Sequence, residues 1–258
     1  MPTALVFGNS HVGPYIRGHR LAQAEGLIGF AAHEVSLQGA RYEPRIRNEP
    51  GRGLLFNPAI AEDICAAIEK VQPVCLITAV MGSAHWIQGM SLEPRPFDFL
   101  VPRLPHHALT PETEIIPYDL MLRRYQADMD WQFGVVRSVQ KISKLPIFHI
   151  EAPPPVESVE LMLKGLPQHA ETKAKMERHG LPSVAFRYKV WWATNDTTQR
   201  ICADIGLHFI AGPSETRSAN GFLDPHFYND GIHGNDQYGK VMAREISRTM
   251  QKLGVESG

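Results

Sequence analysis

The stretch Ala4-Leu-Val-Phe-Gly-Asn-Ser-His11 decides the fold that the sequence predicts. Its apolar part, residues 4–7, is short and continuous and precedes turn-forming residues, a pattern typical of a buried strand. The turn would place the hydroxyl group of Ser10 at the carboxyl end of this strand. Open α/β sheets bind their ligands at the carboxyl ends of their strands. We therefore predict that Ser10 lies where a protein of this class carries out its chemistry.

The segment Asp230-Gly-Ile-His233, near the other end of the chain, contains the partners that a nucleophilic serine needs. A serine hydroxyl becomes an effective nucleophile when a histidine accepts its proton and an acid orients that histidine. An Asp and a His three residues apart can meet on a turn or a first helical turn. We therefore interpret Ser10 as the nucleophile, His233 as general base and then general acid, and Asp230 as the orienting acid. Asp224 is a second candidate acid, and the alternative is a turn serine with a helix-capping Asp–His pair.

These two motifs, Gly8-Asn9-Ser10 and Asp230-x-x-His233, carry a resemblance to a known family. The sequence resembles the SGNH (GDSL-type) hydrolases, whose first motif is usually Gly-Asp-Ser and whose last is Asp-x-x-His. The motifs occur in the family's order at opposite ends of an alternating strand–helix pattern, so the likeness covers nearly the entire chain. The resemblance implies a serine hydrolase, and hydroxyl chemistry of this kind needs no cofactor.

The resemblance also implies an oxyanion hole, with one departure from the family pattern. Its expected donors are the backbone N–H of Ser10, the N–H of Gly39 in the loop after the second strand, and an asparagine after the third strand. Ala84 occupies that asparagine position and has no donor. Because losing one oxyanion donor costs about a hundred- to a thousandfold in rate, two interpretations stay open. Either Ser83 or His85 supplies the hydrogen bond, or the protein is a catalytically impaired ligand-binding protein.

Apolar segments that alternate with helices predict an α/β fold, a doubly wound parallel sheet. The resemblance implies a flavodoxin-like five-stranded sheet of order 2-1-3-4-5. The five strands are expected in residues 4–7, 27–37, 74–80, 145–150 and 207–210. Helices are expected over residues 14–25, 59–71, 117–142, 159–178 and 237–253, and from a cap at Asn195-Asp196 to residue 205.

Length and charge limit the classes of protein and partner. With 258 residues, the chain suits a single large domain spanning residues 1–258. The formal net charge of -1 provides no field that would favour nucleic acid or an anionic membrane, so we expect a small-molecule partner. The three cysteines, Cys65, Cys75 and Cys202, lie in apolar segments without C-x-x-C spacing, which indicates reduced thiols. Without a visible signal peptide or membrane span, we expect a cytoplasmic protein.

Several loops are candidates for contact with substrate. Residues 38–53 are predicted to form an arginine-rich loop, and the arginines there are either a solvated face or an anion clamp. An irregular, proline-rich insertion at about 86–114 follows the third strand and is expected to lie near the active site. The candidate substrate-binding residues are His11, which lines the pocket or caps the first helix, Arg41 and Trp86. The tandem His106-His107 and the cysteines lack metal-ligand spacing, so no catalytic metal is expected.

The sequence thus predicts a serine hydrolase that cleaves carboxylic esters of short acyl groups. Family analogy adds O-acetyl carbohydrate as one substrate class. An acyltransferase on the same scaffold is a second candidate, and the impaired binding protein motivated by Ala84 is a third. The natural ester and the oligomeric state are not encoded in any motif that we identify.

Overall fold

The computed structural model describes residues 1–258 apart from 50–52, 81–94, 105–106, 165–169, 231–232 and 256–258. Its centre is a parallel sheet of five strands in the order β2-β1-β5-β8-β9. In chain order these are sheet strands 2-1-3-4-5, so the predicted fold class and strand order are confirmed. The strands are β1 (Thr3–Gly8), β2 (Ala31–Ser36), β5 (Cys75–Ala79), β8 (Ile147–Ile150) and β9 (His208–Ile210).

Helices cover both faces of the sheet, because successive residues of each central strand point to opposite faces. One face packs on α1 (Val12–Ala24) and α8 (Asp236–Lys252), and its core includes Val6 and Ile77. The other face packs on α2 (Pro58–Val71), α4 (Tyr118–Ile142) and α7 (Val184–Asp204), and its core includes Leu5 and Leu76. The apolar strand runs are therefore buried on both sides, as a parallel sheet requires.

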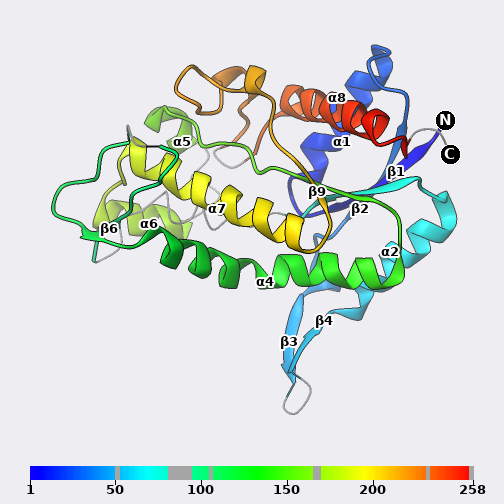
Figure 1. Cartoon of the computed structure of the whole chain (residues 1–258), viewed down its shortest axis with the longest axis horizontal. Coiled ribbons are helices and arrows are strands. Elements are labelled where there is room, and N and C mark those ends of the chain that lie inside the picture. Colours follow the sequence, from blue (N-terminus) through cyan, green and yellow to red (C-terminus); the bar gives the residue numbers. More distant parts are fainter. Residues whose placement is uncertain (50–52, 81–94, 105–106, 165–169, 231–232, 256–258) are drawn as a thin grey trace.

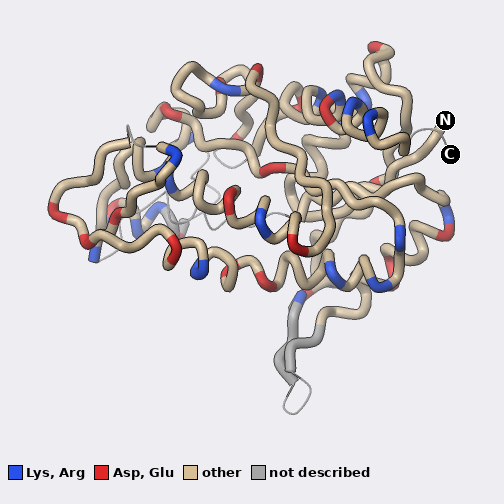
Figure 2. The backbone as a smooth tube through the Cα atoms, in the orientation of Figure 1, with Lys and Arg blue, Asp and Glu red and all other residues tan. Residues whose placement is uncertain are grey.

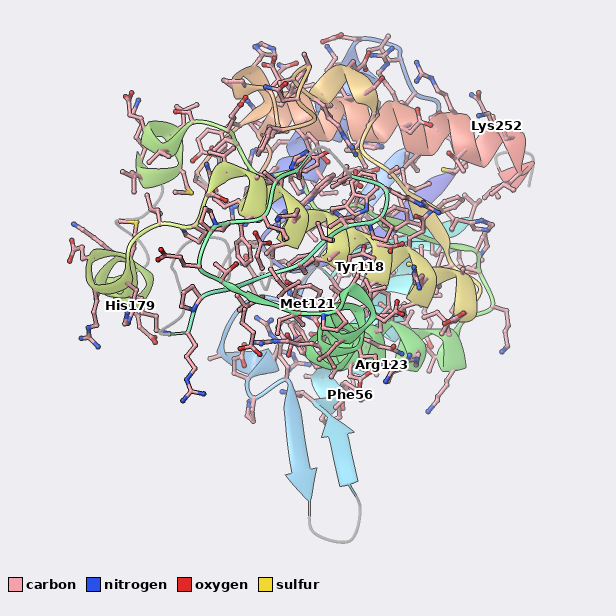
Figure 3. All side chains as sticks on the ribbon, turned by 60° about the vertical axis from the view of Figure 1, so that its left-hand side comes forward. Phe56, Tyr118, Met121, Arg123, His179 and Lys252 are labelled. Carbon is pink, nitrogen blue, oxygen red and sulfur yellow. The ribbon has the colours of Figure 1, made fainter. Side chains whose placement is uncertain are left out.

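The prediction that residues 38–53 form a loop is wrong in part. It contains the short helix η1 (Ala40–Tyr42) and a hairpin of β3 (Ile46–Glu49) and β4 (Gly53–Phe56). The hairpin projects from the helical layer of α2 and α4 (Figures 1 and 3). Phe56 at its base lies against Gly134 of α4, where any Cβ would overlap the phenyl ring. The sequence does not indicate the hairpin, because β3 is mostly polar, β4 shows no alternation of apolar and polar residues, and glycine and proline lie between them.

Two helix predictions also need correction. The helix expected over residues 159–178 is present as two separate helices, α5 (Val159–Lys164) and α6 (Ala170–His179). The helix expected from Asn195-Asp196 begins eleven residues earlier, at Val184, and its N-cap is Ser183, whose hydroxyl accepts a hydrogen bond from the N–H of Phe186 at 3.1 Å. Because α7 is buried around much of its circumference, its apolar residues show no single stripe that would indicate its beginning.

The described part of the insertion at about 86–114 is fixed to the core by a buried ion pair. It contains β6 (Phe97–Asp98) and β7 (Glu114–Ile115), which pair in parallel. The carboxylate of Asp98 lies 2.5 Å from the Lys189 ammonium of α7, and both side chains are fully buried. Asp98 also accepts hydrogen bonds from the N–H groups of Phe99 and Thr110, each at 2.7 Å. These contacts satisfy the buried charges, as burial of an ion pair requires.

Charged residues of both signs are interspersed along the outer helices. Figure 2 shows acidic and basic residues together on α4 and on α8. Several of them form i,i+4 or i,i+3 pairs, such as Arg124–Asp128 and Arg248–Glu245. This distribution is typical of a solvated surface.

Candidate active site

The turn that follows β1 depends on the close approach of two strands. A Cβ at Gly8 would lie 2.5 Å from the carbonyl carbon and oxygen of Ala79, at the end of β5, so a larger residue does not fit there. The N–H of Asn9 donates to the oxygen of Ala79 at 3.4 Å, and the N–H of Val12 donates to the oxygen of Asn9 at 3.1 Å. Ser10 therefore lies in a tight turn between the carboxyl end of β1 and the first residue of α1.

The beginnings of α1 and α8 are brought together by glycine contacts. A Cβ at Gly18 of α1 would overlap the backbone of α8 at Lys240, and one at Gly239 of α8 would overlap the backbone of α1 at Pro14. The two helix backbones are thus in direct contact. Because Ser10 precedes α1 by two residues and His233 precedes α8 by three, this contact also brings those residues together.

Ser10, His233 and Asp230 form one hydrogen-bonded series. The Nε2 atom of His233 lies 2.6 Å from the hydroxyl oxygen of Ser10. The Nδ1 atom of the same ring lies 2.8 Å from Oδ1 and 2.9 Å from Oδ2 of Asp230. The backbone N–H of His233 also donates to Oδ1 of Asp230 at 3.1 Å. The carboxylate therefore fixes the histidine at two points, and the second ring nitrogen faces the serine.

Asn235 holds the segment that carries His233. Its side-chain oxygen caps α8 by accepting hydrogen bonds from the N–H groups of Gln237 and Tyr238, at 3.0 and 3.1 Å. Its amide nitrogen donates to the carbonyl oxygen of His226 at 2.7 Å. One side chain thus ties the start of the helix to the preceding loop, which fixes the approach of His233 to α1.

The structure assigns the two candidate acids to different places. Asp224 caps the short helix η4 (Pro225–Phe227) by accepting a hydrogen bond from the N–H of His226 at 2.8 Å. Asp230 instead contacts His233.

Burial, together with the negative charge of Asp230, raises the pKa of the Tyr228 hydroxyl to about 12. Tyr228 therefore stays protonated, and its hydroxyl donates to the carbonyl oxygen of Leu161 at 2.6 Å.

His11 lies directly against the ring of His233. The centroids of the two imidazole rings are 4.6 Å apart, with the rings tilted by 56°. His11 occupies the N-cap position of α1, but its side chain makes no capping hydrogen bond. Of the two roles considered for His11, helix capping is therefore wrong, and the ring lies beside the candidate catalytic histidine.

Gly39 lies at the end of the strand next to β1. The N–H of Leu37 donates to the carbonyl oxygen of Gly8 at 2.7 Å, which joins the segment after β2 to the turn before Ser10. Gly39 follows two residues later with a φ of 111°, a backbone conformation that favours glycine. The other residues expected to form the oxyanion hole, Ser83 and His85, lie outside the described residues, as do Ala84 and Trp86.

The arginines after β2 are engaged with neighbours where their side chains are described. Arg41 makes two hydrogen bonds of 2.9 Å to the carboxylate of Asp63 on α2. Arg45 lies 3.0 Å from Glu43 and 5.2 Å from the centre of the Trp131 ring. The Arg41 guanidinium is therefore already paired with a carboxylate of the protein, which leaves less of its charge for a substrate anion.

The described residues contain neither a metal-ligating cluster nor a helix suited to span a membrane. Within them, no group of three or more His, Cys, Asp or Glu is placed to hold a metal ion. Cys75 and Cys202 are buried, and burial raises the pKa of the Cys202 thiol to about 12. His107 stacks on the ring of Tyr188 at 5.1 Å, whereas His106 is outside the described part. No described helix is both long and apolar enough to cross a membrane.

A buried ion pair that no sequence motif indicates lies at the same edge of the sheet. Glu151, which follows β8, accepts hydrogen bonds from Arg217 at 2.7 Å and from the N–H of Gly212 at 2.5 Å. Burial raises the pKa of the Glu151 carboxyl, and Arg217 and the Gly212 N–H partly offset this effect. The partners are 66 residues apart in the sequence, so no local motif could have revealed the pair.

Three solved structures align with nearly the whole of this chain. The periplasmic domain of the lipopolysaccharide acetyltransferase of Salmonella ser. Paratyphi A aligns with a TM-score of 0.52 and 13% identity, over 96% of this chain and 83% of that domain. A GDSL-like lipase of Bacteroides thetaiotaomicron aligns with a TM-score of 0.48 and 12% identity, over 97% of this chain and 88% of the lipase. An acetyl xylan esterase aligns with a TM-score of 0.42 and 11% identity, over 96% of this chain and 98% of the esterase.

The likeness to the acetyltransferase domain shows a shared α/β fold. Neither a protein-family model nor a curated protein sequence matches the chain.

Proposed function

We propose that this protein is an SGNH-type serine esterase that cleaves short-chain carboxylic esters. The observation that carries the proposal is the hydrogen-bonded series of Ser10, His233 and Asp230, with distances of 2.6 and 2.8 Å. These distances are within the hydrogen-bond reach expected for a nucleophile, its general base and the group that orients the base. The partner in this proposal is a small-molecule ester, and the predicted cytoplasmic location stays a prediction.

In the proposed reaction, His233 transfers one proton in each of the two halves. As the Ser10 hydroxyl oxygen attacks the ester carbonyl carbon, Nε2 of His233 accepts the hydroxyl proton. The bond between the carbonyl carbon and the alkoxy oxygen then breaks, and the leaving alcohol takes that proton. Water then attacks the carbonyl carbon of acyl-Ser10 while Nε2 of His233 accepts a proton from it. The bond between that carbon and the Ser10 oxygen breaks, the Ser10 oxygen takes the proton, and the acid is released. Asp230 stabilises the imidazolium that forms in both halves.

The negative charge of the intermediate would lie near the N-terminus of α1. This helix has 13 residues, and its first N–H groups and macrodipole favour an anion beside Ser10. In this proposal the N–H groups of Ser10 and Gly39 donate to the oxyanion, and Ser83 or His85 replaces the donor that Ala84 lacks. The helix N-terminus provides part of the stabilisation that a missing side-chain donor would otherwise remove.

The test compares the wild type with Ser10→Ala, Asp230→Asn and His233→Ala on p-nitrophenyl acetate and butyrate. Each variant is expected to lose at least about a thousandfold in kcat/KM, with non-additive losses in the double variants, because the three residues act together. A fluorophosphonate probe should add once to the wild type, as measured by intact mass, and not to Ser10→Ala. Full activity of Ser10→Ala would contradict the mechanism.

Two other functions predict different results from the same proteins. An acyltransferase would give a new ester when an alcohol or a sugar is added, and product analysis would detect it. A catalytically impaired binding protein, which the substitution of Ala84 for the usual asparagine favours, would show neither turnover nor an adduct while remaining folded. A Ser10-dependent release of free acid would favour the esterase over both.

A further inference from the structure

A pocket at the carboxyl ends of β8 and β9 contains neither Ser10 nor His233 among its lining residues. It has a volume of about 200 Å³ and lies between α7 and the segments that follow the two strands, including Glu151 and Ala211. Pockets for drug-sized ligands enclose roughly 300–1,000 Å³, so this one suits a single small ring. It lies at the edge of the sheet at which the ester would react.

One face of α7 presents polar and aromatic side chains to this pocket, whereas its other faces pack in the apolar core. Trp192, Asn195, Asp196 and Gln199 all line it, and their spacing of three and four residues places them on the same side of the helix. Asn and Asp are unfavourable within a helix, because their side chains compete for backbone hydrogen bonds. Together with the ring of Phe209, this face offers an aromatic surface surrounded by planar polar groups.

The charges of the pocket are largely neutralised by the protein itself. Glu151 pairs with Arg217 at 2.7 Å, and the Arg217 guanidinium lies 5.0 Å from the centre of the Trp191 ring. Asp196 pairs with Arg200 at 3.1 Å. Arg103 remains at the exposed rim. A neutral ligand rich in hydrogen-bonding groups therefore fits this lining better than an anion.

Asn195 connects the pocket with a second, smaller cavity, because it lines both. Asn195 also lines a neighbouring cavity of about 20 Å³, together with Gln132 and His149. The Nδ2 atom of Asn195, the Oε1 atom of Gln132 and the Nδ1 atom of His149 are buried, and none of them has a hydrogen-bond partner among the described residues. Such a cavity has room for about one water-sized polar group, which needs at least roughly 10–15 Å³. A hydroxyl group both donates and accepts, and so can satisfy atoms of either kind.

We propose that the pocket binds one hydroxyl-bearing ring of a saccharide and is the subsite for the alcohol part of the ester, an inference that rests on the proposed function. A sugar ring has an apolar face that packs on Trp192 and Phe209, and hydroxyl groups that bond to Asn195, Asp196 and Gln199. In the strand order β1-β5-β8-β9, the pocket lies two to three strands from the strand before Ser10. At about 4.8 Å per strand this is roughly 10–14 Å, which a chain of two or three sugar rings spans.

The experiment measures saccharide binding by the full-length Ser10→Ala protein, using calorimetry and tryptophan fluorescence with xylotriose, cellotriose and chitotriose. At least one trisaccharide is expected to bind. In this background Trp192→Ala and Gln199→Ala should each weaken binding at least tenfold, whereas Trp192→Phe keeps a ring and should retain most of the affinity. Arg123→Ala is the matched control, because Arg123 lines a different cavity, between α4 and α7 (Figure 3). Gln199 is exposed, so its variant should fold even where a Trp192 variant does not.

Failure of all three trisaccharides to bind at millimolar concentration would overturn the subsite, as would binding that neither Trp192→Ala nor Gln199→Ala weakens. Hydrolysis of p-nitrophenyl acetate by the wild type tests the proposed function separately. Ser10-dependent hydrolysis without saccharide binding would overturn the subsite alone. Saccharide binding that depends on Trp192, without Ser10-dependent hydrolysis, would overturn the esterase and leave a saccharide-binding pocket.

Discussion

The contact between α1 and α8 can be perturbed at Gly239 without touching any residue of the candidate site. In Gly239→Ala, the new Cβ would lie 2.9 Å from the Cα of Tyr15 and closer still to the carbonyl oxygen of Pro14. Because carbon atoms pack at about 3.5–4.0 Å, the helices must separate by about 0.6 Å or more. The atoms that must move are backbone, so no side-chain rotation can relieve the overlap.

The separation would act on both stability and rate. Overpacking of this kind costs about 1–3 kcal/mol of unfolding free energy. The same shift moves His233, at the start of α8, away from Ser10, at the start of α1, beyond the present 2.6 Å. A misplacement of about 1 Å in a reacting group can cost about a hundredfold in rate. We therefore expect a loss of about ten- to a hundredfold in kcat/KM.

The assay is hydrolysis of p-nitrophenyl acetate at a temperature where both proteins are folded, with stability measured by urea unfolding. Gly29→Ala is the matched control, because a Cβ at that glycine meets no atom within 4 Å. It should leave rate and stability unchanged. Wild-type kcat/KM in Gly239→Ala, or an equal loss in Gly29→Ala, would refute the argument that this helix contact positions His233.

Three further predictions concern the supports of the site and of the core. Asn235→Ala removes the N-cap of α8, so it should cost about 1 kcal/mol in urea unfolding and lower kcat more than KM rises, because His233 is released. Lys189→Met leaves the carboxylate of Asp98 buried and uncompensated, so it should cost about 3–5 kcal/mol; the double variant with Asp98→Asn should cost less than the sum of the single changes. Burial lowers the pKa of His149 to about 4. Between pH 6.5 and 4 the unfolded chain therefore binds more protons at this histidine than the native protein does. The free energy of unfolding should fall as the pH drops through that range.

Each of these has a result that would contradict it. An Asn235→Ala protein with unchanged kcat would show that the loop alone positions His233. Additive losses in the Lys189 and Asp98 variants would show that the two side chains do not stabilise each other. For the pH dependence, urea titrations compare the wild type with His149→Leu. An equal loss of stability below pH 6.5 in both proteins would show that His149 does not cause it, and would leave His19, whose pKa is also lowered to about 4, as the candidate.

The parts of the fold that the sequence predicted are those with strong local patterns. The runs that form β1 and β5 are apolar and short, and the amphipathic α4 shows helical spacing over its full length. By contrast, α7 is buried around most of its surface, so no apolar stripe indicates where it begins, and the sequence predicts a start eleven residues too late. The polar residues Asn195 and Asp196 therefore resemble a helix cap in the sequence, although they lie within α7. The hairpin of β3 and β4 lacked apolar alternation and was expected to be a loop.

The candidate site could be predicted only because two motifs matched a family in the right order. Ser10 and His233 are 223 residues apart, and no rule of spacing brings them together. Similarly, the ion pairs of Glu151 with Arg217 and of Asp98 with Lys189 join distant segments through tertiary packing. Such contacts depend on how whole elements are placed, which residue patterns do not encode locally.

The glycines of α1 and α8 explain why these elements lie where they do. A glycine within a helix costs about 0.5–1 kcal/mol relative to alanine, so Gly18 and Gly239 weaken their own helices. The compensating gain is the backbone contact, since a Cβ at either position would force the helices apart. The strands repeat this arrangement at Gly8, where β1 approaches the end of β5. The glycines thus fix two placements on which the site depends. Gly8 lets the turn that carries Ser10 lie close to the end of β5, and Gly18 and Gly239 let α1 and α8 bring Ser10 and His233 together.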